Sequence, residues 1–175
     1  MLIQFPIPVL GFAAASGTGK TTLLTQIIAQ LAAQQLRVGL IKHSHHAFEI
    51  DQPGKDSYRL HHAGASSTLL VSPFRRALIS ESTPPQEPSL VEQLHYLALE
   101  NLDLILVEGF KHENICKIEL HRSELHQPFL YLTDSNIIAV ASNAVLALPA
   151  KLTLLDINQP KQCAAFIQQW AHLTS

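Results

Sequence analysis

Short apolar runs alternate along the chain with longer stretches in which apolar residues recur every three to four positions. Residues 9–13 form the first short run, and residues 20–35 follow with leucine and isoleucine side chains on one line, which predicts an amphipathic helix. Residues 102–107 and 137–141 are almost unbroken apolar runs, which are typical of strands covered on both faces of a parallel sheet. The alternation predicts an α/β fold with helices packed on a mostly parallel sheet.

The remaining segments extend this pattern without dividing the chain. Residues 117–122 alternate Ile118 and Leu120 with polar neighbours, which predicts a strand at the sheet edge. Residues 67–71 and 76–80 read as strands joined by a turn at Pro73, and we expect them to form an antiparallel extension at the edge. Further strands are predicted over residues 37–41 and 152–157, and helices over 57–62, over 89–99 and from Pro160, the last burying Cys163, Phe166, Ile167 and Trp170. With no long linker, we expect residues 1–175 to form one domain.

The sequence AAASGTGKTT lies between the first predicted strand and the first predicted helix, which is where a phosphate-binding loop belongs. Gly17 and Gly19 allow backbone amides to turn toward an anion, and the start of the helix adds partial positive charge. Lys20 can reach the outer phosphates, and Thr21 can offer its hydroxyl to Mg²⁺. The pattern begins with Ala14 in place of glycine, and alanine is small enough for the loop to close. We therefore predict a P-loop NTPase-like fold that binds a nucleoside triphosphate with magnesium.

An acidic partner for this loop is expected in the segment LDLILVEGF, which contains Asp103 and Glu108. Five strand residues separate the two carboxylates by roughly 16 Å. Ligands of open α/β sheets gather at the carboxyl ends of the strands. Glu108 is therefore the predicted acidic residue for the metal or its water, and Asp103 is predicted to be a solvent-facing residue at the strand start.

Histidines are frequent, and three of them occur in the sequence KHSHH over residues 42–46. This segment follows a predicted strand and so faces the same edge of the sheet. Three interpretations remain open: a substrate or phosphate loop in which Lys42 and His43 take part, a transition-metal site, and a merely polar loop. Residues 54–65 follow, with Asp56 as a candidate N-cap, and are either a capped surface helix or a substrate contact.

Charge and cysteine content narrow the classes of partner. The 12 basic and 14 acidic residues are interspersed, and the formal net charge is −2, so we expect no nucleic-acid partner. Cys116 and Cys163 are far apart and in no paired motif, which favours a reducing compartment and predicts a cytoplasmic protein. No apolar run approaches the ~18 residues of a membrane span.

Four blocks of sequence, in this order and spacing, carry a resemblance that covers nearly the whole chain: ASGTGKTTLL, GLIKHSHH, PGKDSYRLHHAGA and LDLILVEGFKH. With VAS and LLDIN after them, they are similar to the MobB family, the molybdopterin-guanine dinucleotide biosynthesis adapter proteins of bacteria. The resemblance implies a homodimer that binds GTP with Mg²⁺ and hydrolyses it slowly. It also implies association with MobA, the guanylyltransferase that joins GMP to molybdopterin, and molybdopterin as a further partner.

The resemblance also places the site residues. The phosphate loop falls on Ser16, Gly17, Thr18, Gly19, Lys20, Thr21 and Thr22, and the acidic strand-end residue falls on Glu108. Thr21 and Glu108 are the expected magnesium residues, and Lys111 continues the family pattern. From their place after a buried strand, Ala141, Ser142 and Asn143 are the predicted base pocket. Guanine preference comes from the resemblance alone, because the asparagine-lysine-x-aspartate signature of most GTPases is absent from the sequence.

Two other functions are compatible with the same residues. A small-molecule kinase or ligase would use the histidine loop and Lys111 to hold an acceptor against the γ-phosphate. A metal-delivery GTPase of the nickel type is favoured by the histidines and disfavoured by the lack of a cysteine-histidine pair. For the GTP-binding adapter that the resemblance implies, hydrolysis is expected to be slow, because no motif in the sequence supplies an arginine finger.

Overall fold

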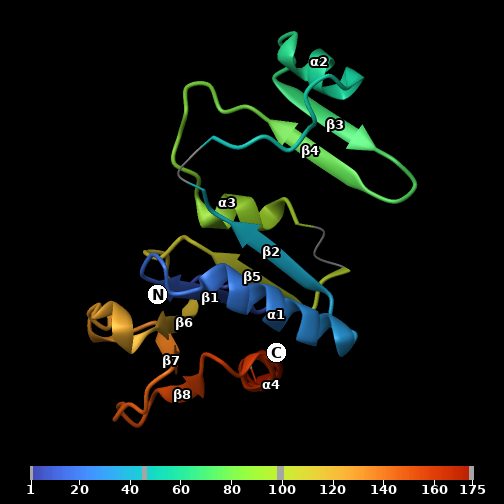
Figure 1. Ribbon diagram of the computed structural model, residues 1–175. Coiled ribbons are helices and arrows are strands. Elements are labelled where there is room, and N and C mark those ends of the chain that lie inside the picture. Colours follow the sequence, from blue (N-terminus) through green and yellow to red (C-terminus); the bar gives the residue numbers. More distant parts are fainter. Residues whose placement is uncertain (1, 45–46, 98–100, 174–175) are drawn as a thin grey trace. The chain divides into compact units, whose positions relative to one another are not determined.

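The computed structural model describes residues 2–44, 47–97 and 101–173. The chain divides into two compact units, a larger one formed by Met1–His43 and Ser89–Ser175 and a smaller one formed by Ser44–Pro88. Figure 1 shows both, with the smaller unit containing α2, β3 and β4. The expectation of a single domain over residues 1–175 stays a prediction.

The larger unit contains a six-stranded sheet in the order β2-β5-β1-β6-β7-β8, and every neighbouring pair of strands is parallel. The sheet confirms the predicted α/β fold. Its strands are β1 (Val9–Ala14), β2 (Val38–Lys42), β5 (Leu104–Glu108), β6 (Cys116–His121), β7 (Ile137–Ser142) and β8 (Thr153–Asp156). Its helices are α1 (Lys20–Ala33), α3 (Leu90–His95) and α4 (Pro160–Leu173), with short 3-10 turns at Ser123–Leu125 and Leu130–Leu132.

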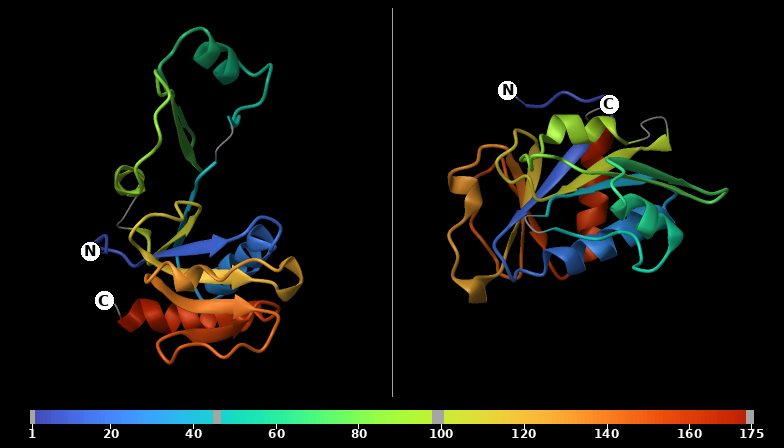
Figure 2. Two further views of the ribbon diagram at one scale, coloured as in Figure 1. Left: turned by 90° about the vertical axis from the view of Figure 1, so that its left-hand side faces the viewer. Right: turned by 90° about the horizontal axis from the view of Figure 1, so that it is seen from above.

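Helices cover both faces of this sheet, as Figure 2 shows. On one face, Leu10 and Phe12 of β1 are buried in a cluster with residues of α1 and α4. On the opposite face, Val9 of β1 and Ile105 of β5 are buried in a cluster with Leu90 and other residues of α3. Because successive strand residues point to opposite faces, an apolar run such as that of β1 supplies both cores.

The predicted edge position of residues 117–122 is wrong, because β6 lies inside the sheet between β1 and β7. Its polar residues are nonetheless buried, with Lys117 2% and Glu119 1% exposed. Lys117 donates a hydrogen bond to Asp134 at 2.8 Å, and Glu119 accepts from the amides of Leu130 and Tyr131 at 2.8 and 2.9 Å. Alternation of polar and apolar residues indicated a solvated face, but buried charges are tolerated when they are paired in this way.

Two helices of the larger unit, α1 and α3, are shorter than predicted, whereas α4 begins at Pro160 as predicted. α1 ends at Ala33, because Gln35 adopts a left-handed φ of 65° that terminates the helix. α3 ends at His95, and residues 98–100 of the predicted helix lie outside the described residues. In α4, Cys163 and Ile167 are fully buried, whereas Phe166 and Trp170 are partly buried against the same core. Across the three described ranges, no helix combines the length and apolar character that a membrane crossing needs.

In the smaller unit, β3 (Ser67–Val71) and β4 (Arg76–Ser80) pair antiparallel, as predicted. They form a two-stranded sheet of their own and do not extend the edge of the main sheet. α2 (Asp56–His62) begins after Lys55, so Asp56 is in the first turn and is not the cap. A hydrogen-bond contact of 2.9 Å joins His61 Nδ1 of α2 to Thr68 Oγ1 of β3.

Candidate functional site

The loop between β1 and α1 has the backbone shape that its glycines predict. Gly17 and Gly19 have φ of 81° and 83°, a left-handed conformation in which a β-carbon is strained. The Thr18 hydroxyl donates to the carbonyl of Ala15 at 3.0 Å and closes the loop from inside. Ala14 is the last residue of β1, in extended backbone that any residue adopts, so alanine fits the first position of the pattern.

The start of α1 offers donors to an anion. Gly19 is the N-cap and has no side chain with which to satisfy the first-turn amides. These amides have no partner within the helix, and the helix dipole places partial positive charge at the same point. The other predicted members of the loop, Ser16, Gly17, Thr21 and Thr22, are exposed around it. This arrangement is a phosphate-binding geometry.

Three predicted residues meet beside the loop, at the carboxyl ends of β2 and β5. Lys42 and Glu108 are register partners on these strands, and Lys42 Nζ lies 3.6 Å from Glu108 Oε2. The ammonium of Lys20 contacts Glu108 Oε1. The Glu108 side chain, only 12% exposed, thus lies between two cations. A phosphate bound at the loop competes with this carboxylate for Lys20, because both are anions that an ammonium can pair with.

Asp103 occupies the opposite end of β5, as predicted. It forms an ion pair with Arg37, with 3.0 Å between Nη2 and Oδ1, at the amino ends of β5 and β2. Hydrogen bonding from the Arg37 side chain holds the pKa of the Asp103 carboxyl below its usual value. Asp103 is therefore part of a structural ion pair and is remote from the phosphate loop.

His43 lies against the turn that follows Glu108. Its backbone amide donates to the Glu108 carbonyl at 2.8 Å, and its ring stacks on Phe110 with 4.6 Å between centroids. Gly109 allows this approach, because its φ is 97° and a β-carbon there would lie 2.7 Å from that of His43. Lys111 follows in the same turn and is exposed. Residues His45 and His46 of the predicted histidine loop lie outside the described residues.

The predicted base-side residues already have partners within the protein. The Ser142 hydroxyl is buried and accepts from the Ala144 amide at 3.2 Å. The Asn143 side chain donates to Glu124 at 2.7 Å and accepts from the Ser123 amide at 3.1 Å. These contacts fix the orientation of the Asn143 amide group.

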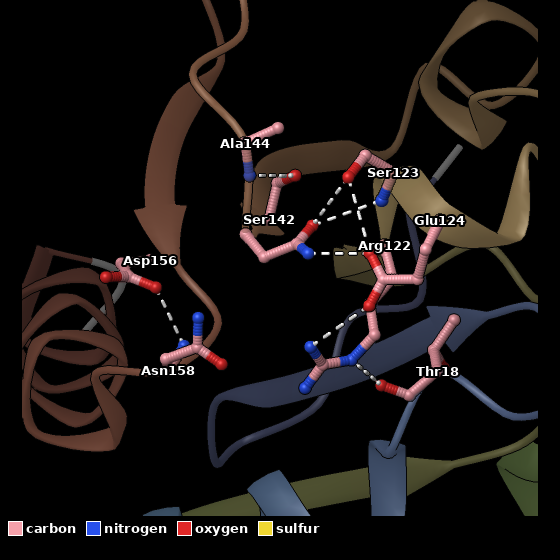
Figure 3. Close-up of polar contacts among 9 residues, drawn as sticks. Thr18, Arg122, Ser123, Glu124, Ser142, Ala144, Asp156 and Asn158 are labelled. Carbon is pink, nitrogen blue, oxygen red and sulfur yellow. Dashed lines mark hydrogen bonds and ion pairs between the residues drawn. The ribbon is translucent and has the colours of Figure 1, made fainter.

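Two charged residues near Ser142 and Asn143, Arg122 and Glu124, were not among the residues predicted from the sequence. Arg122, which follows β6, donates from Nε to the Thr18 carbonyl at 3.0 Å (Figure 3). Glu124 lies between Arg122 and Asn143. The position of Arg122 directly after a strand was the available signal, since the same criterion selected Glu108.

The residues present fit a magnesium ion of the kind that accompanies nucleotides. Mg²⁺ is usually held by one or two protein oxygens together with phosphates and water. Thr21 presents a hydroxyl in the first turn of α1, and Glu108 presents a carboxylate at the edge of the same loop. Within the described part of the chain, no three His, Cys, Asp or Glu residues are grouped as a metal site of protein ligands alone.

The sheet order, the glycine loop and the residues around it define a P-loop nucleotide-binding fold. Residues 9–143 match the family model for molybdopterin guanine dinucleotide synthesis protein B. The chain is 48% identical over 165 residues to the molybdopterin-guanine dinucleotide biosynthesis adapter protein of Escherichia coli, covering 94% of this chain and 93% of that one. It is 45% identical over 166 residues to the protein of that name from Haemophilus influenzae, covering 95% and 90%. The chain belongs to the MobB family.

Solved structures agree on the fold. A crystal structure of a MobB protein homolog from Bacillus stearothermophilus superposes with a TM-score of 0.69 at 23% identity and covers 94% of this chain and 98% of that chain. Bacillus subtilis MobB superposes with a TM-score of 0.71 at 22% identity, covering 93% and 97%. At this identity, the likeness supports the fold of the chain and does not extend to its ligands.

Proposed function

We propose that this chain is a GTP-binding adapter protein of molybdopterin guanine dinucleotide biosynthesis that assists the guanylyltransferase MobA. Membership of the MobB family supports the pathway, and the names of the 48% and 45% identical relatives support the adapter role. The observation that carries nucleotide binding is the meeting of Lys20, Lys42 and Glu108 beside an anion-binding loop. We propose that the protein acts in the cytoplasm, which its two unpaired cysteines support.

The geometry supports a simple order of events at the site. The triphosphate binds the loop amides, and Lys20 exchanges its contact with Glu108 for the outer phosphates. Thr21, and Glu108 directly or through a water molecule, would hold Mg²⁺, and the ion would supply positive charge that neutralises the phosphates. Glu108, released from Lys20 but still beside Lys42, can then accept a hydrogen bond from the attacking water. We propose that hydrolysis at this site is slow and Mg²⁺-dependent.

We expect GTP to bind at least tenfold more tightly than ATP, a difference of about 1.4 kcal/mol. A site that hydrogen-bonds one edge of the base should reach this discrimination, and Ser142 and Asn143 are the base-side residues proposed for it. Competition of unlabelled ATP and GTP against a fluorescent GTP analogue measures the ratio. ATP binding as tightly as GTP would instead favour the small-molecule kinase or ligase.

The adapter role is tested with the partner enzyme itself. Adding the purified chain and GTP to the guanylyltransferase should increase the formation of molybdopterin guanine dinucleotide, and the Lys20→Ala variant should increase it less. If neither the parent chain nor the Lys20→Ala variant changes the rate of this reaction, even at concentrations above those in the cell, the chain is not an adapter of this enzyme.

We further propose that the protein is a homodimer, with an apolar face of the smaller unit as the contact. Leu69 and Leu78 are cross-strand partners on β3 and β4 and are 59% and 50% exposed, and Val71 beside them is 72% exposed. In water, such an apolar face favours association. Sedimentation should show a dimer that Leu69→Asp converts to monomers, whereas Val145→Asp, at an exposed position of the larger unit, should leave the dimer intact.

A further inference from the structure

Arg122 holds the phosphate loop from the side opposite to Glu108. It follows β6, which neighbours β1 on one side, whereas β5 with Glu108 neighbours β1 on the other. Its Nε donates to the carbonyl of Thr18, a residue only 3% exposed, at 3.0 Å. Its Nη2 lies 3.9 Å from the point where a β-carbon on Gly19 would be. A guanidinium thus lies against the backbone of the loop at the residue before α1.

The same guanidinium also contacts Glu124. Glu124 in turn is hydrogen-bonded to Asn143, which with Ser142 belongs to the base-side segment, the predicted base pocket. Its Nη1 lies 3.7 Å from Glu124 Oε1, and Glu124 Oε2 accepts from Asn143 Nδ2 at 2.7 Å. Ser123 completes the connection, because its amide donates to Asn143 Oδ1 at 3.1 Å. Figure 3 shows Arg122 between Thr18 and Glu124. The Glu124 backbone amide and the Asn143 side chain hold the pKa of the Glu124 carboxyl below its usual value, so it stays charged at neutral pH.

The residues on the two sides of the phosphate loop set the direction in which a bound nucleotide would lie. Lys20, Lys42 and Glu108 gather on the β5 side of the loop, so a terminal phosphate and its water belong there. Arg122 and Asn143 follow β6 and β7, so the inner phosphates and the nucleoside extend toward them. Arg122 is therefore placed near the part of the ligand that GTP and GDP share.

We infer that Arg122 is a positioning residue of the nucleotide site, which joins the phosphate loop to the base-side segment through Glu124 and Asn143. The inference rests on the proposed binding of GTP. A guanidinium suits this role because its planar fork can donate to Thr18 and face Glu124 at once. A lysine keeps the charge but has neither the fork nor its fixed geometry. Loss of Arg122 frees the loop and the base-side segment to move independently, which lowers affinity for every guanine nucleotide that uses both.

Calorimetric titration with GTP and with GDP tests this role. Arg122→Gln should weaken both ligands by the same factor, about tenfold, and leave the ratio of their affinities unchanged. Arg122→Lys should recover only part of the loss. Lys42→Gln, which changes the β5 side, should weaken GTP more than GDP. Arg37→Gln is the matched control, because it removes a guanidinium from an ion pair at the opposite end of the strands and should change neither affinity.

A double-variant cycle then tests the connection through Glu124. Glu124→Ala should weaken both nucleotides, and adding Arg122→Gln to it should cause less than half of the fold-loss that Arg122→Gln causes alone, since the connection is already broken. Thermal unfolding of each unliganded variant should stay within about 2 °C of the parent, and a larger fall would show that Arg122 only stabilises the fold. Equal affinity in Arg122→Gln and parent overturns the inference and leaves GTP binding intact. A parent chain that binds neither nucleotide overturns the proposed function itself.

Discussion

Replacing Lys20 with alanine is expected to weaken GTP binding by at least about 100-fold, which corresponds to about 2.7 kcal/mol. A charge-assisted hydrogen bond contributes ~1.5–3 kcal/mol, and the lysine of a phosphate loop makes more than one. Lys20 also pairs with Glu108, and because it gives up this contact to bind phosphate, the net loss is smaller than the sum of its phosphate contacts. Isothermal titration of GTP with Mg²⁺ into parent and variant measures the difference.

The fold should tolerate this change, because Lys20 belongs to no hydrophobic cluster of the described residues and Lys42 remains beside Glu108 when Lys20 is removed. Circular dichroism should give the same spectrum for the variant and the parent. Lys161→Ala, at an exposed position of α4, is the matched control and should bind GTP like the parent. Equal affinity of the Lys20→Ala variant and the parent would exclude the loop as the triphosphate site.

Periodicity predicted the parts of the fold that depend on burial. The strands β1, β5 and β7 were predicted because their apolar runs are long enough to supply two cores. The position of β6 was predicted wrongly because Lys117 and Glu119 are polar in sequence but paired in space, with Asp134 and with backbone amides. Such partners lie outside the strand itself, so no pattern within it reveals them.

In the candidate site too, residues that belong to a local sequence pattern were predicted, and a residue whose position depends on the order of the strands was missed. Lys20 and Glu108 were selected because each belongs to a local pattern at the carboxyl end of a strand. Arg122 was missed because its place beside the loop depends on β6 lying next to β1, and the sequence predicted β6 at the edge. A strand order predicted correctly would have placed Arg122 beside Thr18, within reach of the loop.

Changing Glu108 to glutamine is expected to spare GTP affinity and to slow hydrolysis by roughly 100-fold. Affinity is spared because the carboxylate competes with phosphate for Lys20, so its removal costs no contact with the phosphates. Hydrolysis slows because an amide accepts a hydrogen bond from the attacking water much more weakly than a carboxylate. Single-turnover hydrolysis of radiolabelled GTP at saturating protein measures the rate without interference from product release.

A magnesium titration separates this role from a purely metal-binding one. If Glu108 orients the water, the rate of the Glu108→Gln variant stays low at every Mg²⁺ concentration. If Glu108 only supports the ion, the variant needs more Mg²⁺ but recovers the parent rate at saturation, because one negative charge has left the surroundings of the metal. Asp103→Asn is the matched control, since it changes a carboxylate at the other end of the same strand, in an ion pair with Arg37, and should alter neither curve. A Glu108→Gln variant with the parent's rate and metal dependence would show that Glu108 serves only as the partner of Lys20 and Lys42, and the catalytic half of the proposed site would have to be abandoned.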